Sequence, residues 1–438
     1  MGMLEAIGNA LRIPELRRKI LFTLGLFLIF RILAHIAVPG ADKNALDRLF
    51  HNNAFLGLLD LFSGGGLSRF SIIAMGVNPY INATIIMQLM TVVSTRMKEL
   101  SKEGEYGRRK ITRWSRWLTV ALGLLQAWGL TLLFSQQGVL NGATLGWFGT
   151  VAIMLTLTAG TVMLMWFGEL ITEYGIGNGI SLVIFAGIVG RIPTTIYNLL
   201  TGGGATQNLA PLLLFAALAV VVTAFIIEVQ QAQRKIPIQS AQRVVGRKVY
   251  QGRSSHLPLR VNQAGVIPII FAISIMFFPV IIGNFLATAP SPWGDISRAL
   301  RTYWVPAGPN IPTDILYNFV YFILIFGFTY FYTAVTFDPV DTADYLKKHA
   351  AFIPGIRPGV ATAQYLDRTM TRITFAGALF LGGVTVLIPL LATALTRIPT
   401  QNMYLGGTAI LIVVGVALDT MKQIETQLIM RQYKGFIK

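Results

Sequence analysis

Ten long apolar runs dominate this sequence of 438 residues, and nearly all of them contain no charged residue. A helix needs about 20 apolar residues to cross a bilayer. Because the bilayer core holds almost no water, the backbone of each run must satisfy its own hydrogen bonds, which predicts helices. The expected spans are residues 20–38, 72–95, 117–135, 149–168, 176–191, 211–228, 263–286, 315–336, 373–395 and 404–421.

The composition agrees with a chain that faces lipid. Only 13% of the residues are charged, against about 25% in soluble proteins, and the mean hydropathy is +0.61. The expected fold is therefore an all-α integral membrane protein with ten transmembrane helices. Cysteine is absent, which excludes disulfides and thiol chemistry.

The basic residues alternate from one inter-span segment to the next, and this alternation predicts the orientation. Residues 12–19, 96–116, 230–262, 337–372 and the stretch after 419 together hold 28 of the 36 Lys and Arg residues. The alternate loops hold six. The positive-inside rule therefore places both termini in the cytoplasm, as an even number of spans requires.

A Gly-rich, uncharged loop at residues 193–210 has five spans before it and five after it. Five is odd, so the second half begins from the opposite side of the membrane. We therefore expect two pseudo-symmetric inverted halves, residues 1–200 and 201–438, with a functional site at their interface.

The segment LLDLFSGGGLSRF, residues 58–70, is too short to span and carries Asp60 and Arg69. An outside loop with a short surface helix is the commoner form of such a segment. The alternative is a re-entrant element folded back among the helices, where surrounding protein satisfies its backbone. The sequence leaves both open.

Arg31 is the one charge well inside a predicted span. Its burial at the centre of a span costs about 2.5–3.5 kcal/mol. We therefore expect this side chain to extend toward the interface or to pair with a neighbour; a role in transport is the less favoured alternative.

Two pairs of branched aliphatic residues stand four apart, each directly after a glycine: Val77 with Ile81, and Ile180 with Ile184. Each pair lies on one face of its helix. Ordinary helix packing explains such spacing. The alternative is a narrow apolar constriction, which blocks ions by excluding water.

The two long cytoplasmic segments, 230–262 and 337–372, exceed the usual length of connecting loops. The first contains VVGRKVYQG, which reads as a β-hairpin with residues 246–248 at its tip. In the second, the prolines of FIPGIRPG (352–359) hold Arg357 on a stiff loop. These segments are either solvated loops or docking surfaces, and their apolar content favours docking.

Catalytic and metal-binding motifs are missing from the sequence. The four histidines lack metal-ligand spacing, and GxxxxGK[ST], HExxH and GxSxG do not occur. GIGNG (175–179) follows a helix rather than a strand and predicts a tight turn. We expect no enzyme, no metal and no cofactor. A secondary transporter of a small solute remains as an alternative, although only Arg31 supplies a charge at mid-membrane.

Six motifs spread over nearly the whole chain resemble the SecY family, the central channel subunits of the bacterial Sec translocon. They are GGLSRFSIIAMGVNPYINATIIMQLMTVV (65–93), KEGEYGRRKITR (102–113), WFGELITEYGIGNGISLVIFAGIV (166–189), GRKVYQGRSSHLPLRVNQAGVIPIIFA (246–272), TADYLKKHAAFIPGIRPG (342–359) and YLGGTAILIVV (404–414). The chain departs from the family pattern at Val77, where isoleucine is common, and at Arg247-Lys248, where two arginines are usual.

The resemblance implies a channel that translocates unfolded preproteins across the bacterial plasma (inner) membrane and inserts membrane proteins sideways into it. Spans two and three facing spans seven and eight would form the lateral gate. The implied pore ring is Val77, Ile81, Ile180, Ile184, Ile270 and Ile412. The implied plug is Leu61, Phe62, Ser63, Gly64, Gly65, Gly66, Leu67, Ser68, Arg69 and Phe70.

The resemblance also implies partners. They are the small membrane subunits SecE and SecG, the motor ATPase SecA, the ribosome, signal sequences with their unfolded preproteins, and the lipid bilayer. Arg247, Lys248 and Arg357 would dock the cytosolic partners.

Overall fold

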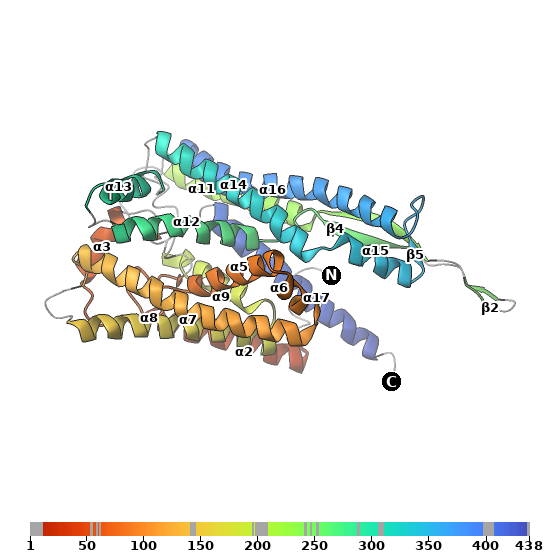
Figure 1. The fold of residues 1–438 in the computed structure, drawn as a ribbon, viewed down its shortest axis with the longest axis horizontal. Coiled ribbons are helices and arrows are strands. Elements are labelled where there is room, and N and C mark those ends of the chain that lie inside the picture. Colours follow the sequence, from red (N-terminus) through yellow and green to blue (C-terminus); the bar gives the residue numbers. More distant parts are fainter. Residues whose placement is uncertain are drawn as a thin grey trace.

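The structure is a computed structural model. It describes residues 12–52, 56–57, 60, 63–140, 146–194, 197, 209–240, 243–245, 248–250, 254–286, 290–304, 311–396 and 407–435. Long helices lie side by side in an elongated bundle, and short strands gather at one end of it (Figure 1).

Among the described residues, the first part of the chain forms several helices. They are α2 (Pro14–Leu33), α3 (Lys43–Asn52), α5 (Asn78–Val93), α6 (Thr95–Lys102), α7 (Glu105–Gln136), α8 (Trp147–Tyr174) and α9 (Gly179–Val189). The second part contributes α11 (Leu209–Gln231), α12 (Ile267–Phe285), α13 (Trp293–Tyr303), α14 (Ile311–Thr336), α15 (Pro339–Lys348), α16 (Val360–Thr396) and α17 (Gly407–Gly435).

Every predicted apolar run overlaps one of these helices, but several boundaries differ. The helix predicted from residue 72 begins at Asn78, with Pro79 in its first turn. Gly76 before it has φ +59°, a conformation that stops a helix from starting earlier. At the other extreme, α16 begins at Val360 rather than at 373, directly after Gly359 at φ +101°. Hydropathy marks the lipid-facing part of a helix, whereas glycines and caps determine where the helix ends.

Five segments of the described residues are long and apolar enough to cross a membrane. They are Glu105–Gln136, Trp147–Tyr174, Ile315–Lys348, Val360–Ala392 and Gly407–Met430. Shorter apolar helices cover Gly179–Thr194, Ala216–Gln231 and Ile267–Met276. Lipid-length helices in this number establish a multi-pass membrane protein.

The two long polar segments contain strands, so the all-α prediction needs a correction there. β1 (Gln233–Ser240) pairs antiparallel with β4 (Ser254–Arg260) and with β5 (Ala351–Phe352), in the order β4-β1-β5. The predicted hairpin is confirmed as β2 (Arg243–Val245) with β3 (Lys248–Tyr250), but Lys248, predicted at its tip, pairs with Val245 as the first residue of β3. β1 alternates, with Ile236 and Ile238 buried, which is the pattern of a strand covering a core on one face.

The two long predicted cytoplasmic segments gather at one end of the bundle. α15 and both sheets lie there, and the hairpin labelled β2 projects farthest from the helices, whereas α6 lies nearer the middle of the view beside α5 and α7 (Figure 1). α3 and α13, both from predicted outside loops, lie at the opposite end. The fold therefore separates the two kinds of segment along its long axis, as the charge pattern predicts.

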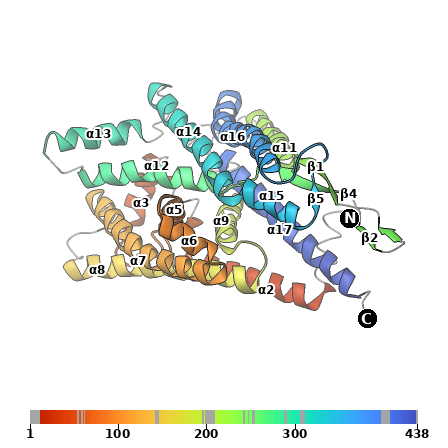
Figure 2. The same cartoon turned by 45° about the vertical axis from the view of Figure 1, so that its right-hand side comes forward.

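The two parts of the chain meet along a few helices. α5 and α7 pack against α12, and α9 packs against α17. Figure 2 shows α2, α7 and α8 on one side, α14 and α16 on the other, and α5, α9 and α12 between them. The central helices therefore carry the contact between the two parts.

Close helix packing generates the first prediction. A Cβ atom on Gly160 of α8 would lie 2.1 Å from the carbonyl oxygen of Ile72, whereas one on Gly327 of α14 would meet nothing within 4 Å. We expect Gly160→Ala to destabilise the protein by about 1–3 kcal/mol through overpacking. The control, Gly327→Ala, should stabilise α14 by up to about 1 kcal/mol. Thermal unfolding in detergent measures both, and equal melting temperatures would show that the approach at Ile72 is looser than described.

Candidate functional site

The six aliphatic residues of the predicted ring come together in the centre of the bundle. Five of them, Val77, Ile81, Ile184, Ile270 and Ile412, are buried members of one apolar cluster. Ile180 is half-buried and packs against the same cluster. They come from the start of α5 and from α9, α12 and α17, so both parts of the chain contribute.

The turn GIGNG positions the α9 residues. It separates α8 from α9 as predicted, with Gly177 at φ +88°. The Asn178 side chain accepts a hydrogen bond from the Ser181 N–H at 3.3 Å and so caps α9. The Thr172 hydroxyl accepts from the Gly179 N–H at 2.9 Å. A Cβ on Gly179 would lie 1.7 Å from the carbonyl oxygen of Gly168, so only glycine allows α8 and α9 this close.

An open cavity of about 460 Å³ adjoins the ring, and Ile81, Ile180, Ile184 and Ile270 all line it. Its polar wall includes the ion pair between Arg116 and Glu169, 2.8 Å apart. A second cavity of about 610 Å³ reaches along α17 as far as Met430. The two cavities share lining residues Asn178, Ser181, Ile267 and Tyr332. Four ring residues therefore line the first cavity, and the second cavity adjoins it toward the end of α17.

The segment before α5 is folded back into the protein, so the surface-loop alternative is wrong. Ser63, Leu67 and Phe70 are buried, and among the described residues of the segment only Arg69 and, in part, Ser68 reach the surface. Leu61 and Phe62 lie outside the described residues. The Phe70 ring lies against Phe134 of α7, with ring centroids 5.1 Å apart.

Backbone hydrogen bonds tie the end of this segment to the chain that follows α2. The Val38 N–H donates to the Phe70 carbonyl at 2.8 Å, and the Ile72 N–H donates to the Ile36 carbonyl at 3.1 Å. Irregular backbone buried in a membrane protein needs such partners. Residues 70–72 are therefore the anchored end of the segment.

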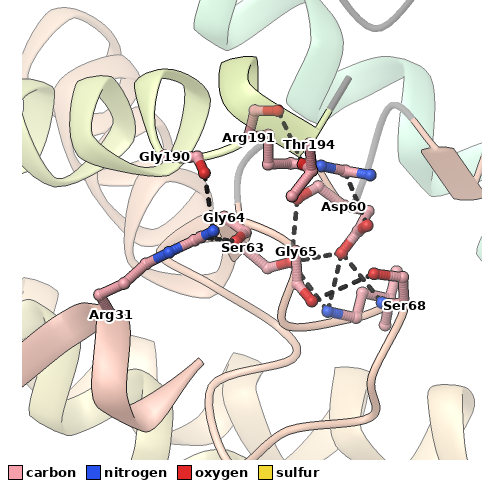
Figure 3. A network of polar contacts seen from close by, with 10 residues as sticks. Arg31, Asp60, Ser63, Gly64, Gly65, Ser68, Gly190, Arg191 and Thr194 are labelled. Atoms are coloured by element: carbon pink, nitrogen blue, oxygen red, sulfur yellow. Dashed lines mark hydrogen bonds and ion pairs between the residues drawn. The ribbon is translucent and has the colours of Figure 1, made fainter. Parts of the chain in front are cut away.

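Side chains hold the other end, and Arg31 is one of them. Its Nη1 donates to the Gly64 carbonyl at 2.8 Å and its Nη2 to the Gly190 carbonyl at 2.6 Å (Figure 3). Gly190 is the C-cap of α9, where backbone carbonyls lack helical partners and a cation is favoured. Of the two expectations for Arg31, pairing with neighbours is confirmed.

Asp60 is the second polar anchor, and the sequence did not indicate its partner. Its side chain is fully buried (0% exposed) and lies 2.7 Å from the Nη1 atom of Arg191, which is 14% exposed. Arg191 directly follows the apolar run of α9. A buried carboxylate in an apolar segment needs a cation. The one available signal was an acidic residue within an apolar segment, and nothing in the sequence identified Arg191 as its partner.

The three predicted docking residues are described unequally. Arg357 is exposed on the loop between β5 and α16, and Ile353 of the same loop is buried against Ile236 and Leu366. The Thr362 hydroxyl also donates to the Arg357 carbonyl at 2.9 Å. The loop is thus held in place beneath an exposed guanidinium. Lys248 opens β3 opposite Val245, and Arg247 lies outside the described residues.

Acidic and imidazole groups do not form a metal site in the part of the chain that the structure describes, since no three of them come close enough to share an ion. The features that the fold assembles are therefore an apolar ring, a buried segment beside it, and exposed basic groups at one end.

Comparisons with known proteins agree with this arrangement. The sequence model of the SecY family matches residues 71–421. Protein translocase subunit SecY of Streptomyces scabiei is 42% identical over 448 residues, and that of Mycobacterium bovis is 43% identical; each alignment covers 100% of both chains.

Two solved structures share the fold. One is a protein-conducting channel, with a TM-score of 0.64 and 18% identity, and the other is Sec61 in the canine ribosome–channel complex, with a TM-score of 0.61 and 18% identity. Each comparison covers 96% of both chains. These similarities support a protein-translocation channel and not a solute transporter. The full-length match to the translocase subunits shows that this chain belongs to the SecY family.

Proposed function

We propose that the six ring residues form the seal of a pore through which unfolded preproteins cross the bacterial plasma membrane. The observation that carries this proposal is their meeting in one apolar cluster beside the cavities. Aliphatic side chains make no hydrogen bonds that a passing polypeptide would have to break. A narrow apolar ring also excludes water and ions when closed.

We further infer that residues 1–200 and 201–438 are the two halves around this pore, crossing the membrane ten times with both termini in the cytoplasm. Contacts between the halves are concentrated where α5 and α7 meet α12 and where α9 meets α17. Separation of α5 and α7 from α12 would open the pore toward lipid. Signal sequences and membrane segments of the substrate would leave by that side.

The buried segment, residues 61–70, is proposed as the plug that covers the pore while no substrate is present. Its described residues, 63–70, are mostly buried. A related channel is described as one whose plug domain stabilises the closed state and maintains a membrane seal. Burial by packing and a few polar contacts suits a segment that must leave and return.

The ring gives the second prediction. Replacing Ile81, Ile184 and Ile270 together by serine should raise the resting ion conductance of the purified complex in planar bilayers, because hydroxyl groups let water enter the constriction. The matched control replaces three exposed aliphatic residues, Ile32, Ile323 and Leu391, by serine. The control should not leak. Equal conductance of ring variant and unaltered protein would refute the seal.

We propose that cytosolic partners dock on Arg357, Arg247 and Lys248. By its family, the chain would work with the small subunits SecE and SecG, with the motor SecA and with the ribosome. Sec61 has been described in a ribosome–channel complex. The guanidinium of Arg357 on its anchored loop suits a carboxylate or phosphate better than a lysine would. Lys248 opens β3 of the projecting hairpin. The positive charges of Arg247 and Lys248 suit the phosphates of ribosomal RNA.

Docking gives the third prediction. Arg357→Glu should abolish SecA-driven translocation while the protein still folds and inserts. Arg368→Glu, an equal change of charge at an exposed site on α16, is the control and should remain active. Reversing the charge of Arg247 and Lys248 should weaken ribosome binding. It should also reduce the slope of the logarithm of the binding constant against the logarithm of salt concentration by about 2 in magnitude. If Arg357→Glu translocates normally, the docking role of Arg357 is wrong, and the loop between β5 and α16 is an ordinary solvated loop.

A further inference from the structure

The two carboxylate oxygens of Asp60 have different kinds of partners. Oδ1 accepts from the Ser63 hydroxyl at 3.0 Å and from the N–H groups of Leu67 and Ser68, both at 2.9 Å. These three donors belong to the same buried segment and would move with it. Oδ2 faces Arg191, beyond the segment, at 2.7 Å (Figure 3). The ion pair is therefore a contact that must break if the segment moves as a unit.

Arg191 connects this contact to the ring. It follows Gly190, the C-cap of α9, and the same helix carries Ile180 and Ile184 at its other end. Arg31 adds a parallel contact, because it donates both to Gly64 of the segment and to Gly190. Asp60 thus faces Arg191 in a region that also holds Arg31, with Arg69 exposed on the same segment. Loss of the single carboxylate would leave cations there without a countercharge.

We propose that the Asp60–Arg191 ion pair is an electrostatic latch that holds the plug against the end of α9 in the closed channel and gives way when water enters the pore. This proposal rests on the proposed function of residues 61–70 as the plug. The energy of an ion pair falls steeply as the surrounding dielectric rises. The latch is therefore strong in the closed, dry channel and weak once a substrate has opened and hydrated it, so that opening is cooperative.

The test uses Asp60→Asn, Arg191→Gln and the double variant in the reconstituted full complex. Asparagine keeps an oxygen acceptor for the three donors within the segment and removes only the charge. We expect each single variant to raise the resting conductance on the order of tenfold, since removing one partner of a buried pair strongly destabilises the state that contains it. The double variant should leak no more than the worse single variant, because the two changes remove the same contact.

A second readout follows the plug itself. Since the chain has no cysteine, Leu67→Cys, at a buried position of the segment, introduces the one thiol of the chain for an impermeant reagent. This thiol should be protected at rest in the otherwise unaltered chain and labelled at rest when Asp60→Asn is added. Arg191→Lys, which keeps the positive charge, should leak less than Arg191→Gln. Asp295→Asn, which removes an exposed ion pair with Arg298, is the control and should change neither readout.

Two results would overturn the latch. One is resting conductance and labelling unchanged in both single variants; the other is a double variant whose effect is the sum of the two, which would mean that the residues act independently. If the ring variant leaks while the latch variants do not, the proposed latch is wrong but the proposed channel function is supported. If the ring variant does not leak and the reconstituted unaltered chain moves no preprotein, the proposed function itself fails.

Discussion

The bilayer core supplies no hydrogen bonds, and most of this structure is a response to that constraint. Helices satisfy their own backbone, and the long apolar helices of the chain do so. The irregular stretch before α5 cannot, and it is buried only because other parts of the protein supply its partners. Backbone from residues 36–38 holds one end, while Arg31 and Arg191 hold the other.

The two polar anchors make the buried segment conditionally stable. Removal of one partner from a buried ion pair generally costs about 3–5 kcal/mol, which is large beside the stability of a single element. The same charges are well solvated in water. On the latch proposal, a segment held in this way stays in place while its surroundings are dry and is released when they become wet, whereas the proposed ring beside it consists of aliphatic side chains.

The sequence-based prediction succeeded where contact with lipid or with water determines the residue pattern. Each predicted apolar run lies on a helix. Connecting segments rich in basic residues, such as those with the sheets and α15, lie at one end of the bundle, and α3 and α13 lie at the other. It failed at boundaries such as the starts of α5 and α16, where a glycine with positive φ decides and hydropathy does not change. It also missed the β4-β1-β5 sheet, because β1 and β5 are more than 100 residues apart and their pairing is not local.

By itself, the sequence determined that the chain crosses a membrane as helices, and its motifs indicated the SecY family, because both follow from residue types read along the chain. Only the tertiary structure decided which residues face one another. In it, Val77, Ile184, Ile270 and Ile412 come together from four separate segments. The segment before α5 is buried, and Asp60 pairs with Arg191. Those outcomes depend on contacts between residues far apart in the chain, which local pattern and composition do not encode.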